Sequence, residues 1–140
     1  MSIPKMDVVR AWFKRADNDL RAAEMAFTLE SPLYDIACFH AQQCAEKYLK
    51  GFLVYNEIDF PKTHVIEYLV SICKPFAPSI QSMLNNVEIL SNYAVESRYP
   101  MDNSSLYEIP RHKAKEAITM AKKVRSTIIT LMGSNMTVIL

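Results

Sequence analysis

The stretch from Phe39 to Leu53 constrains the fold of this chain more than any other. Wound as a helix together with Ala37, it separates into an arc of small and aromatic side chains and an opposite polar arc. The first arc consists of Ala37, Ala41, Cys44, Ala45, Tyr48 and Phe52, and the second of His40, Gln42, Gln43, Glu46, Lys47 and Lys50. Small residues let a neighbouring helix approach closely, so we predict this helix at the centre of a bundle. Its polar arc is expected to face water, a ligand or a partner.

The scarcity of glycine favours an all-α fold. Only two glycines occur in 140 residues, whereas sheets joined by tight turns usually need more. Half of the residues are hydrophobic and the formal net charge is +1, which excludes a disordered tail and a strongly basic nucleic-acid binder. A chain of this length can bury a core without disulfides or metals.

Apolar residues at three- and four-residue steps predict five helices. The first carries its apolar stripe from Val9 to Phe27, and its charged residues are expected to be solvated. The second runs from Pro32 to Tyr55, begins at a Ser31-Pro32 cap and ends at Asn56. These two helices are expected to form an antiparallel hairpin. The residues assigned to the solvated face of the first helix are Arg10, Lys14, Arg15, Asp17, Asp19, Arg21 and Glu24.

The second half of the chain is divided by prolines. Thr63 is predicted to cap a short third helix, which Pro75 and Pro78 end. A fourth amphipathic helix is predicted over residues 80–94, and a fifth follows Pro110 and ends at Gly133. The expected architecture is a five-helix up-and-down bundle in a single domain, 1–133, followed by a C-terminal tail, 134–140.

The expected location is the cytoplasm. The N-terminus lacks the apolar run of a signal peptide, and no apolar segment approaches the roughly 20 residues that span a bilayer. Three cysteines without a paired spacing are typical of a reducing compartment. We therefore expect a soluble protein without a membrane partner.

Metal and phosphate-loop chemistry find little support in the sequence. His40 and Cys44 have the spacing of two ligands on one helix, but no second closely spaced pair accompanies them, so no metal or cofactor is predicted. Neither Gly51 nor Gly133 stands in the context of a phosphate-binding loop.

Basic residues from several predicted elements could line a cleft for phosphate or a polynucleotide backbone. Lys62 and His64 stand at the start of the third helix, and Arg98 stands where the chain turns. The alternative is that these side chains are solvated and cover apolar edges of the helices. The other basic candidates are Lys47 and Lys50 on the second helix and Arg111, Lys115, Lys122 and Arg125 on the fifth.

Three apolar residues interrupt the polar arc of the second helix: Ile36, Phe39 and Leu53. They indicate either a homodimer or partner interface, or cover by the fourth or fifth helix within one chain. The sequence leaves both possibilities open.

Three motifs in this order resemble the HEPN family. They are FHAQQCAEKYLK from Phe39 to Lys50, Lys62-Thr63-His64, and Ser97-Arg98-Tyr99-Pro100. The resemblance extends from the first helix to about Met132. It implies an all-α bundle of the type found in substrate-binding subunits of nucleotidyltransferases, usually dimeric. It also implies a minimal nucleotidyltransferase as partner, in a two-component module that can be a toxin–antitoxin pair.

Many members of this family are ribonucleases in which an Arg is followed, after four to six residues, by a His. Here the corresponding positions after Arg98 are Asn103, Ser104 and Ser105, and Arg111 is followed directly by His112. This departure removes the acid–base group from its place and favours a protein that does not cleave RNA.

The leading hypothesis is therefore a non-catalytic, homodimeric HEPN protein that binds nucleotide or substrate and acts with a nucleotidyltransferase. The alternatives are a metal-independent ribonuclease toxin with a rearranged His, and a structural partner with no ligand. The site residues predicted for the leading hypothesis are Arg98, Tyr99, Lys62, His64, Lys47 and His40.

Overall fold

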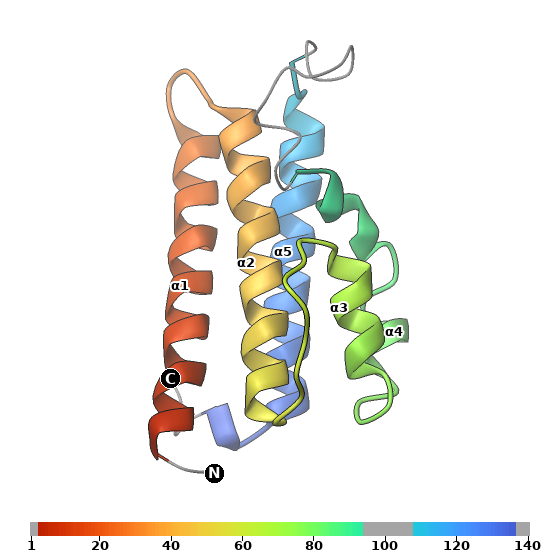
Figure 1. Ribbon diagram of the computed structural model, residues 1–140. Helices are drawn as coiled ribbons and strands as arrows, with labels where there is room; N and C mark the ends of the chain where they lie inside the picture. Colours follow the sequence, from red (N-terminus) through yellow and green to blue (C-terminus); the bar gives the residue numbers. More distant parts are fainter. Residues whose placement is uncertain (1–2, 94–107, 137–140) are drawn as a thin grey trace.

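Three long helices lie side by side and carry most of the structure, a computed structural model that describes residues 3–93 and 108–136 (Figure 1). They are α1 (Ile3–Thr28), α2 (Tyr34–Tyr55) and α5 (Arg111–Met132). Two short α-helices, α3 (Ile66–Cys73) and α4 (Ile80–Met83), and the 3-10 helix η1 (Val87–Tyr93) form a layer on the side away from α1. The described ranges contain helices and no strands, which confirms the all-α prediction.

Helix α2 is the centre of the bundle, as its sequence predicts. It contacts α1, α5, α3 and η1. The predicted apolar arc is buried along its whole length, and the Phe13 ring of α1 stacks on Tyr48 with 5.1 Å between ring centroids. Gly51 lies against α1, where a Cβ atom would come within 2.7 Å of Phe13 Cε1.

The prediction that the polar arc of α2 is open on the surface is wrong for much of the arc. Gln42, Glu46 and Lys50 are 0%, 4% and 8% exposed. After α2 the chain turns back and residues 56–65 run along this face before α3 begins (Figure 1). A helical wheel shows which residues share a face, but it contains no information about a distant segment that covers the face.

The monomer also covers part of the apolar surface on that arc. Leu53 is fully buried, whereas Ile36 and Phe39 are half-buried. Leu53 is therefore covered within one chain and is not available as a partner interface. The Phe39 ring lies edge-on to the His40 ring, with 5.3 Å between ring centroids.

Two predicted helix starts are displaced. Helix α2 begins at Tyr34 instead of Pro32, because the turn closes at Leu33, whose N–H donates to the Ala26 carbonyl over 3.0 Å. Thr63 does not cap α3: its hydroxyl accepts from the Val65 N–H, one residue before the helix.

The N–H of Ile66, the first residue of α3, donates instead to Ser91 Oγ in η1 over 2.9 Å. The start of α3 is thus satisfied from a distant element. Local capping rules could not identify this partner, because they consider only neighbouring residues.

The predicted fourth helix is largely absent as an α-helix. Only Ile80–Met83 is α-helical, and after a turn the chain continues as η1. Asn86 adopts φ 67°, a left-handed conformation that asparagine tolerates better than most residues and that ends an α-helix. The apolar spacing still has its predicted effect, since Ile80, Leu84, Val87 and Leu90 are buried.

The helix ends at Asn56 and Gly133 are confirmed. Gly133 has φ 58°, which suits glycine, and its N–H donates to the Ile129 carbonyl over 3.0 Å. The apolar stripe of α5 is buried at Ala114, Ala117, Ile118, Ala121, Val124 and Ile128, whereas Leu131 is half-buried and Met132 is buried in its place. Of the predicted tail, residues 134–136 fall within the described ranges.

In the parts of the chain that the structure describes, none of the helices has the length and apolarity to span a membrane.

Three buried thiols predict alkaline sensitivity. Cys38, Cys44 and Cys73 are free and fully buried, and burial raises the pKa of Cys38 and of Cys73 to about 12. The pKa of Cys44 is raised by burial and by the nearby Asp17 and Asp19 carboxylates. Because these groups ionise at lower pH when unfolded than when folded, they leave stability intact below about pH 9 and reduce it as pH rises towards 12.

We expect the free energy of unfolding in urea to fall by about 1 kcal/mol per thiol between about pH 8 and pH 10. In Cys73→Ala, the free energy of unfolding should fall by about 1 kcal/mol less than in the unmodified protein over the same pH interval. Because the change with pH is compared, the stability of the variant at neutral pH does not enter. A decrease of equal size in both proteins would contradict this origin.

Candidate functional site

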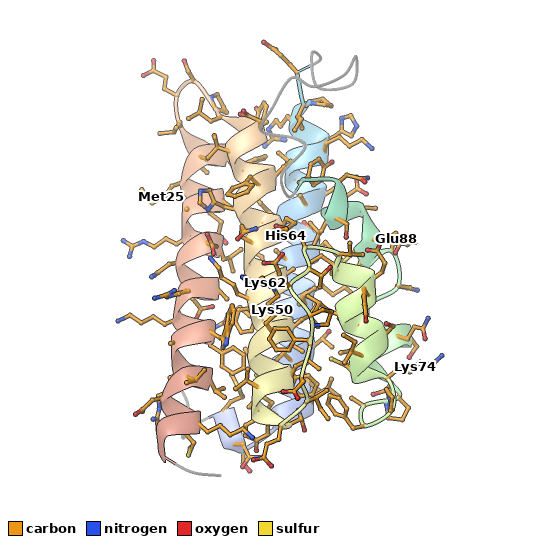
Figure 2. The ribbon with its side chains drawn as sticks, in the orientation of Figure 1. Met25, Lys50, Lys62, His64, Lys74 and Glu88 are labelled. Carbon is orange, nitrogen blue, oxygen red and sulfur yellow. The ribbon has the colours of Figure 1, made fainter. Side chains whose placement is uncertain are left out.

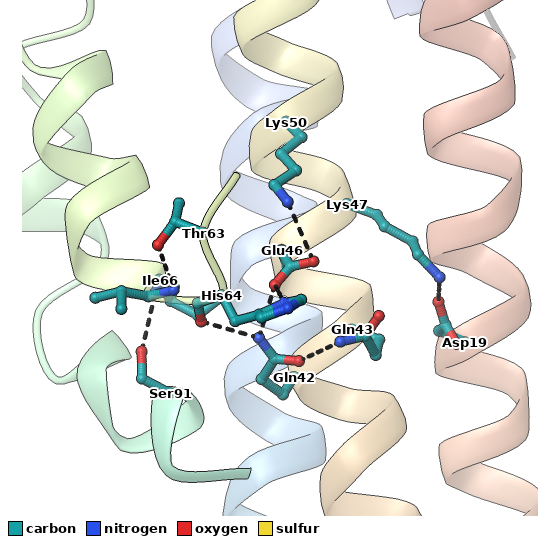
Figure 3. A network of polar contacts seen from close by, with 11 residues as sticks. Asp19, Gln42, Gln43, Glu46, Lys47, Lys50, Thr63, His64, Ile66 and Ser91 are labelled. Carbon is teal, nitrogen blue, oxygen red and sulfur yellow. Dashed lines mark hydrogen bonds and ion pairs between the residues drawn. The ribbon is translucent and has the colours of Figure 1, made fainter. Parts of the chain in front are cut away.

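A buried carboxylate on α2 organises the first polar cluster (Figure 3). Glu46 Oε1 lies 2.7 Å from His64 Nδ1 and accepts from Gln42 Nε2 over 3.2 Å. Its second oxygen, Oε2, lies 3.4 Å from Lys50 Nζ. The side chains of Glu46 and Lys50 are 5% and 10% exposed, whereas that of His64 is 55% exposed. The cluster therefore links a buried ion pair to an imidazole at the surface.

Gln42 fastens the chain around His64 to α2. Its side-chain amide donates to the His64 backbone carbonyl over 3.2 Å, and its oxygen accepts from Gln43 Nε2 over 2.7 Å. Gln42 is fully buried, and both of these bonds are part-buried. Both the backbone and the ring of His64 are thereby held.

A second carboxylate, on α1, organises a similar cluster on the other side of α2. Asp19 Oδ1 lies 2.7 Å from His40 Nδ1, and Asp19 Oδ2 accepts from Lys47 Nζ over 2.5 Å. The Asp19 side chain is 11% exposed, and those of His40 and Lys47 are 30% and 23% exposed. We refer to Glu46–His64–Lys50 and Asp19–His40–Lys47 as the two His–carboxylate–Lys triads.

The triads share one arrangement. In each, a carboxylate lies between the Nδ1 atom of an imidazole and the ammonium of a lysine. The single lysine balances the single carboxylate, so charge neutrality in the triad does not require a protonated imidazole. Holding Nδ1 fixes the ring orientation and leaves Nε2 as the atom that can meet a ligand.

The predicted site residues fall into three groups. His64 and Lys62 are exposed on the segment that crosses α2, and within the described ranges Lys62 has no carboxylate partner (Figure 2). His40 and Lys47 are engaged with Asp19, and no described contact joins them to Lys62 or His64. The remaining two, Arg98 and Tyr99, lie outside the described residues.

Three of the four basic candidates on α5 contact α1 instead of this face. Arg125 Nε donates to Asp17 over 2.9 Å, and Asp17 also accepts from the buried Tyr48 hydroxyl. Lys122 pairs with Glu24 at 3.2 Å, and the Arg111 guanidinium lies 4.9 Å from the centre of the Phe27 ring. Arg125 and Lys122 thus pair with carboxylates of α1, and Arg111 covers an aromatic ring, as the alternative of cover for apolar edges predicts for it. Burial and the bond to Asp17 raise the pKa of the Tyr48 hydroxyl.

The prediction that Asp19 lies on the solvated face of α1 is wrong, because Asp19 is only 8% exposed. A signal was present: Asp19 follows Ala16 by three residues and precedes Ala23 by four, which places it on the buried stripe of α1. Glu46 was recognised as part of the polar arc, but its burial depends on residues 56–65, which no local pattern places there.

Across residues 3–93 and 108–136, no three His, Cys, Asp or Glu side chains are grouped as they would be around a metal ion. Cys44, the partner of His40 in the candidate ligand pair, is fully buried.

Comparison with known proteins identifies the family. The model of the HEPN domain matches residues 9–131. This chain belongs to the HEPN family. The match includes every residue of the two triads, from Asp19 on α1 to His64 on the segment before α3.

Relatives and solved structures agree with this assignment. A protein of Methanocaldococcus jannaschii, provisionally named toxin MJ1304, is 28% identical, with 85% of this chain and 84% of the relative covered. The crystal structure of TT1696 from Thermus thermophilus superposes with a TM-score of 0.71 at 25% identity, covering 86% of this chain and 94% of that one. ST0689, described as an archaeal HEPN homologue, gives a TM-score of 0.64 at 26% identity, covering 89% and 98%.

Proposed function

We propose that this HEPN protein binds a nucleotide or another phosphate-bearing substrate and acts as the non-catalytic subunit of a minimal nucleotidyltransferase. In this proposal it works as a homodimer in a two-component module, which can be a toxin–antitoxin pair. The family membership supports the proposal, and so does the absence of a His four to six residues beyond Arg98.

The observation that carries the proposal is the pair of exposed side chains Lys62 and His64. An exposed lysine without a carboxylate partner in the described ranges is available to a phosphate. His64 stands two residues away with its ring already oriented by Glu46. A pre-oriented group loses little conformational entropy when a ligand binds.

The proposal also includes Lys47 and His40, which lie on α2 in the triad on its other side. Together the lysines at 47, 50 and 62 exceed the carboxylates of Asp19 and Glu46 by one positive charge. Arg98 and Tyr99 are included because of the Ser97–Pro100 motif alone. In the proposal, Arg98 binds phosphate and Tyr99 shapes the site.

Substitution of Lys62 by Ala should weaken ATP binding about fivefold, because one exposed charge-assisted contact contributes about 1 kcal/mol. The measurement is isothermal titration calorimetry with ATP. Lys74→Ala is the matched control, since Lys74 is also an exposed lysine but lies beyond α3 (Figure 2). Arg98→Ala should likewise weaken binding without unfolding the domain. Equal affinity in the Lys62 and Lys74 variants would count against the site.

A second function, metal-independent RNA cleavage, is favoured by one feature of the triads. His40 and His64 each hold Nδ1 on a carboxylate, which is how general acid–base imidazoles are often oriented. The provisional name of the M. jannaschii relative points the same way. Cleavage of single-stranded RNA in the presence of a chelator, lost in Arg98→Ala or in one His→Ala variant, would replace the non-catalytic proposal.

A further inference from the structure

The charge balance around Glu46 determines how His64 can present itself. Glu46 carries one negative charge, and the nearly buried Lys50 ammonium neutralises it at 3.4 Å. A neutral imidazole then meets the carboxylate as a hydrogen-bond donor, because an ionised carboxylate can only accept. In this neutral form, His64 Nδ1 carries the proton and His64 Nε2 carries the lone pair.

Contacts with Gln42 and Glu46 hold His64 so that its two ring nitrogens do not easily exchange the roles of donor and acceptor. Gln42 binds the His64 carbonyl and also donates to Glu46, so the backbone and the acceptor are held by the same amide. The ring is 55% exposed, and Nε2 has no hydrogen-bond partner among the described residues. The surface thus presents a fixed acceptor two residues along the chain from the exposed Lys62.

We infer that Glu46 is a positioning residue that keeps His64 Nε2 as a hydrogen-bond acceptor, so that the site prefers ribonucleotides. This inference rests on the proposed function. Lys62 binds a phosphate, and Nε2 accepts from a hydroxyl of the same ligand. Within a nucleotide, the ribose supplies hydroxyl donors close to the phosphate, and a sugar without them leaves the acceptor unused.

The test compares ATP with 2′,3′-dideoxy-ATP by calorimetry at about pH 8. We expect ATP to bind about three- to tenfold more tightly, the effect of one solvent-accessible hydrogen bond. His64→Asn retains a donor for Glu46 but has no group at the Nε2 position, so the preference should disappear. His112→Asn, an exposed histidine of α5, should retain it.

A second measurement addresses positioning directly. Nitrogen-15 NMR of the imidazoles should show His64 with its proton on Nδ1, and Glu46→Gln should lower both this population and the preference for ATP. A proton on Nε2 in the unmodified protein, or equal binding of the two nucleotides, would overturn the inference while leaving nucleotide binding intact. Failure of both nucleotides to bind would overturn the proposed function together with the inference.

Discussion

Replacement of Glu46 by Ala is expected to lower the free energy of unfolding by about 3 kcal/mol. The substitution leaves the Lys50 ammonium, 10% exposed, without its counter-charge and removes an acceptor from the fully buried Gln42 amide. An unpaired charge in such surroundings costs far more than the pair contributes, because its hydration is lost without compensation. Urea denaturation measures the effect.

Two further variants make this expectation specific. Glu24→Ala breaks an ion pair with Lys122 whose side chains are 46% and 56% exposed, and it should cost no more than about 0.5 kcal/mol. Adding Lys50→Met to Glu46→Ala should recover part of the loss, since it removes the orphaned charge. A Glu46→Ala protein as stable as Glu24→Ala would show that the cluster does not depend on its carboxylate.

Gly51→Val is expected to destabilise the protein by about 3 kcal/mol, through overpacking between α1 and α2. A Cβ atom at this position would lie 2.7 Å from Phe13 Cε1 and 3.0 Å from Trp12 Cβ. Phe13 cannot yield easily, because it is fully buried and stacked on Tyr48. The two helices must therefore separate or the ring must leave its stacked position.

Gly51→Ala separates this clash from helix propensity. Alanine favours the helix by about 1 kcal/mol over glycine, so an Ala variant that loses stability must do so through packing. In a Phe13→Leu background the ring is absent, and there Gly51→Ala should become neutral or stabilising. Thermal and urea denaturation of the four proteins gives the coupling energy. Similar effects of Gly51→Ala in both backgrounds would contradict a clash with the Phe13 ring.

The long helices could be predicted because their information is local. The repeat of apolar residues in α1, the arc of small residues in α2 and the stripe in α5 each lie within one segment, and a helix satisfies its backbone within the same segment. Prediction failed where a distant element intervened. Ser91 satisfies the start of α3, and Asn86 interrupts a stretch whose apolar spacing alone indicates one continuous helix.

The same distinction applies to the candidate site. The sequence alone determined the all-α class, the central position of α2 and membership of the HEPN family, since periodicity and motifs are properties of contiguous residues. Only the tertiary structure decided that Glu46 is buried, and that Asp19 and Glu46 each join an imidazole to a lysine. Those contacts cross from α1 to α2 and from residues 56–65 to α2, and contacts of this kind depend on how segments pack in space.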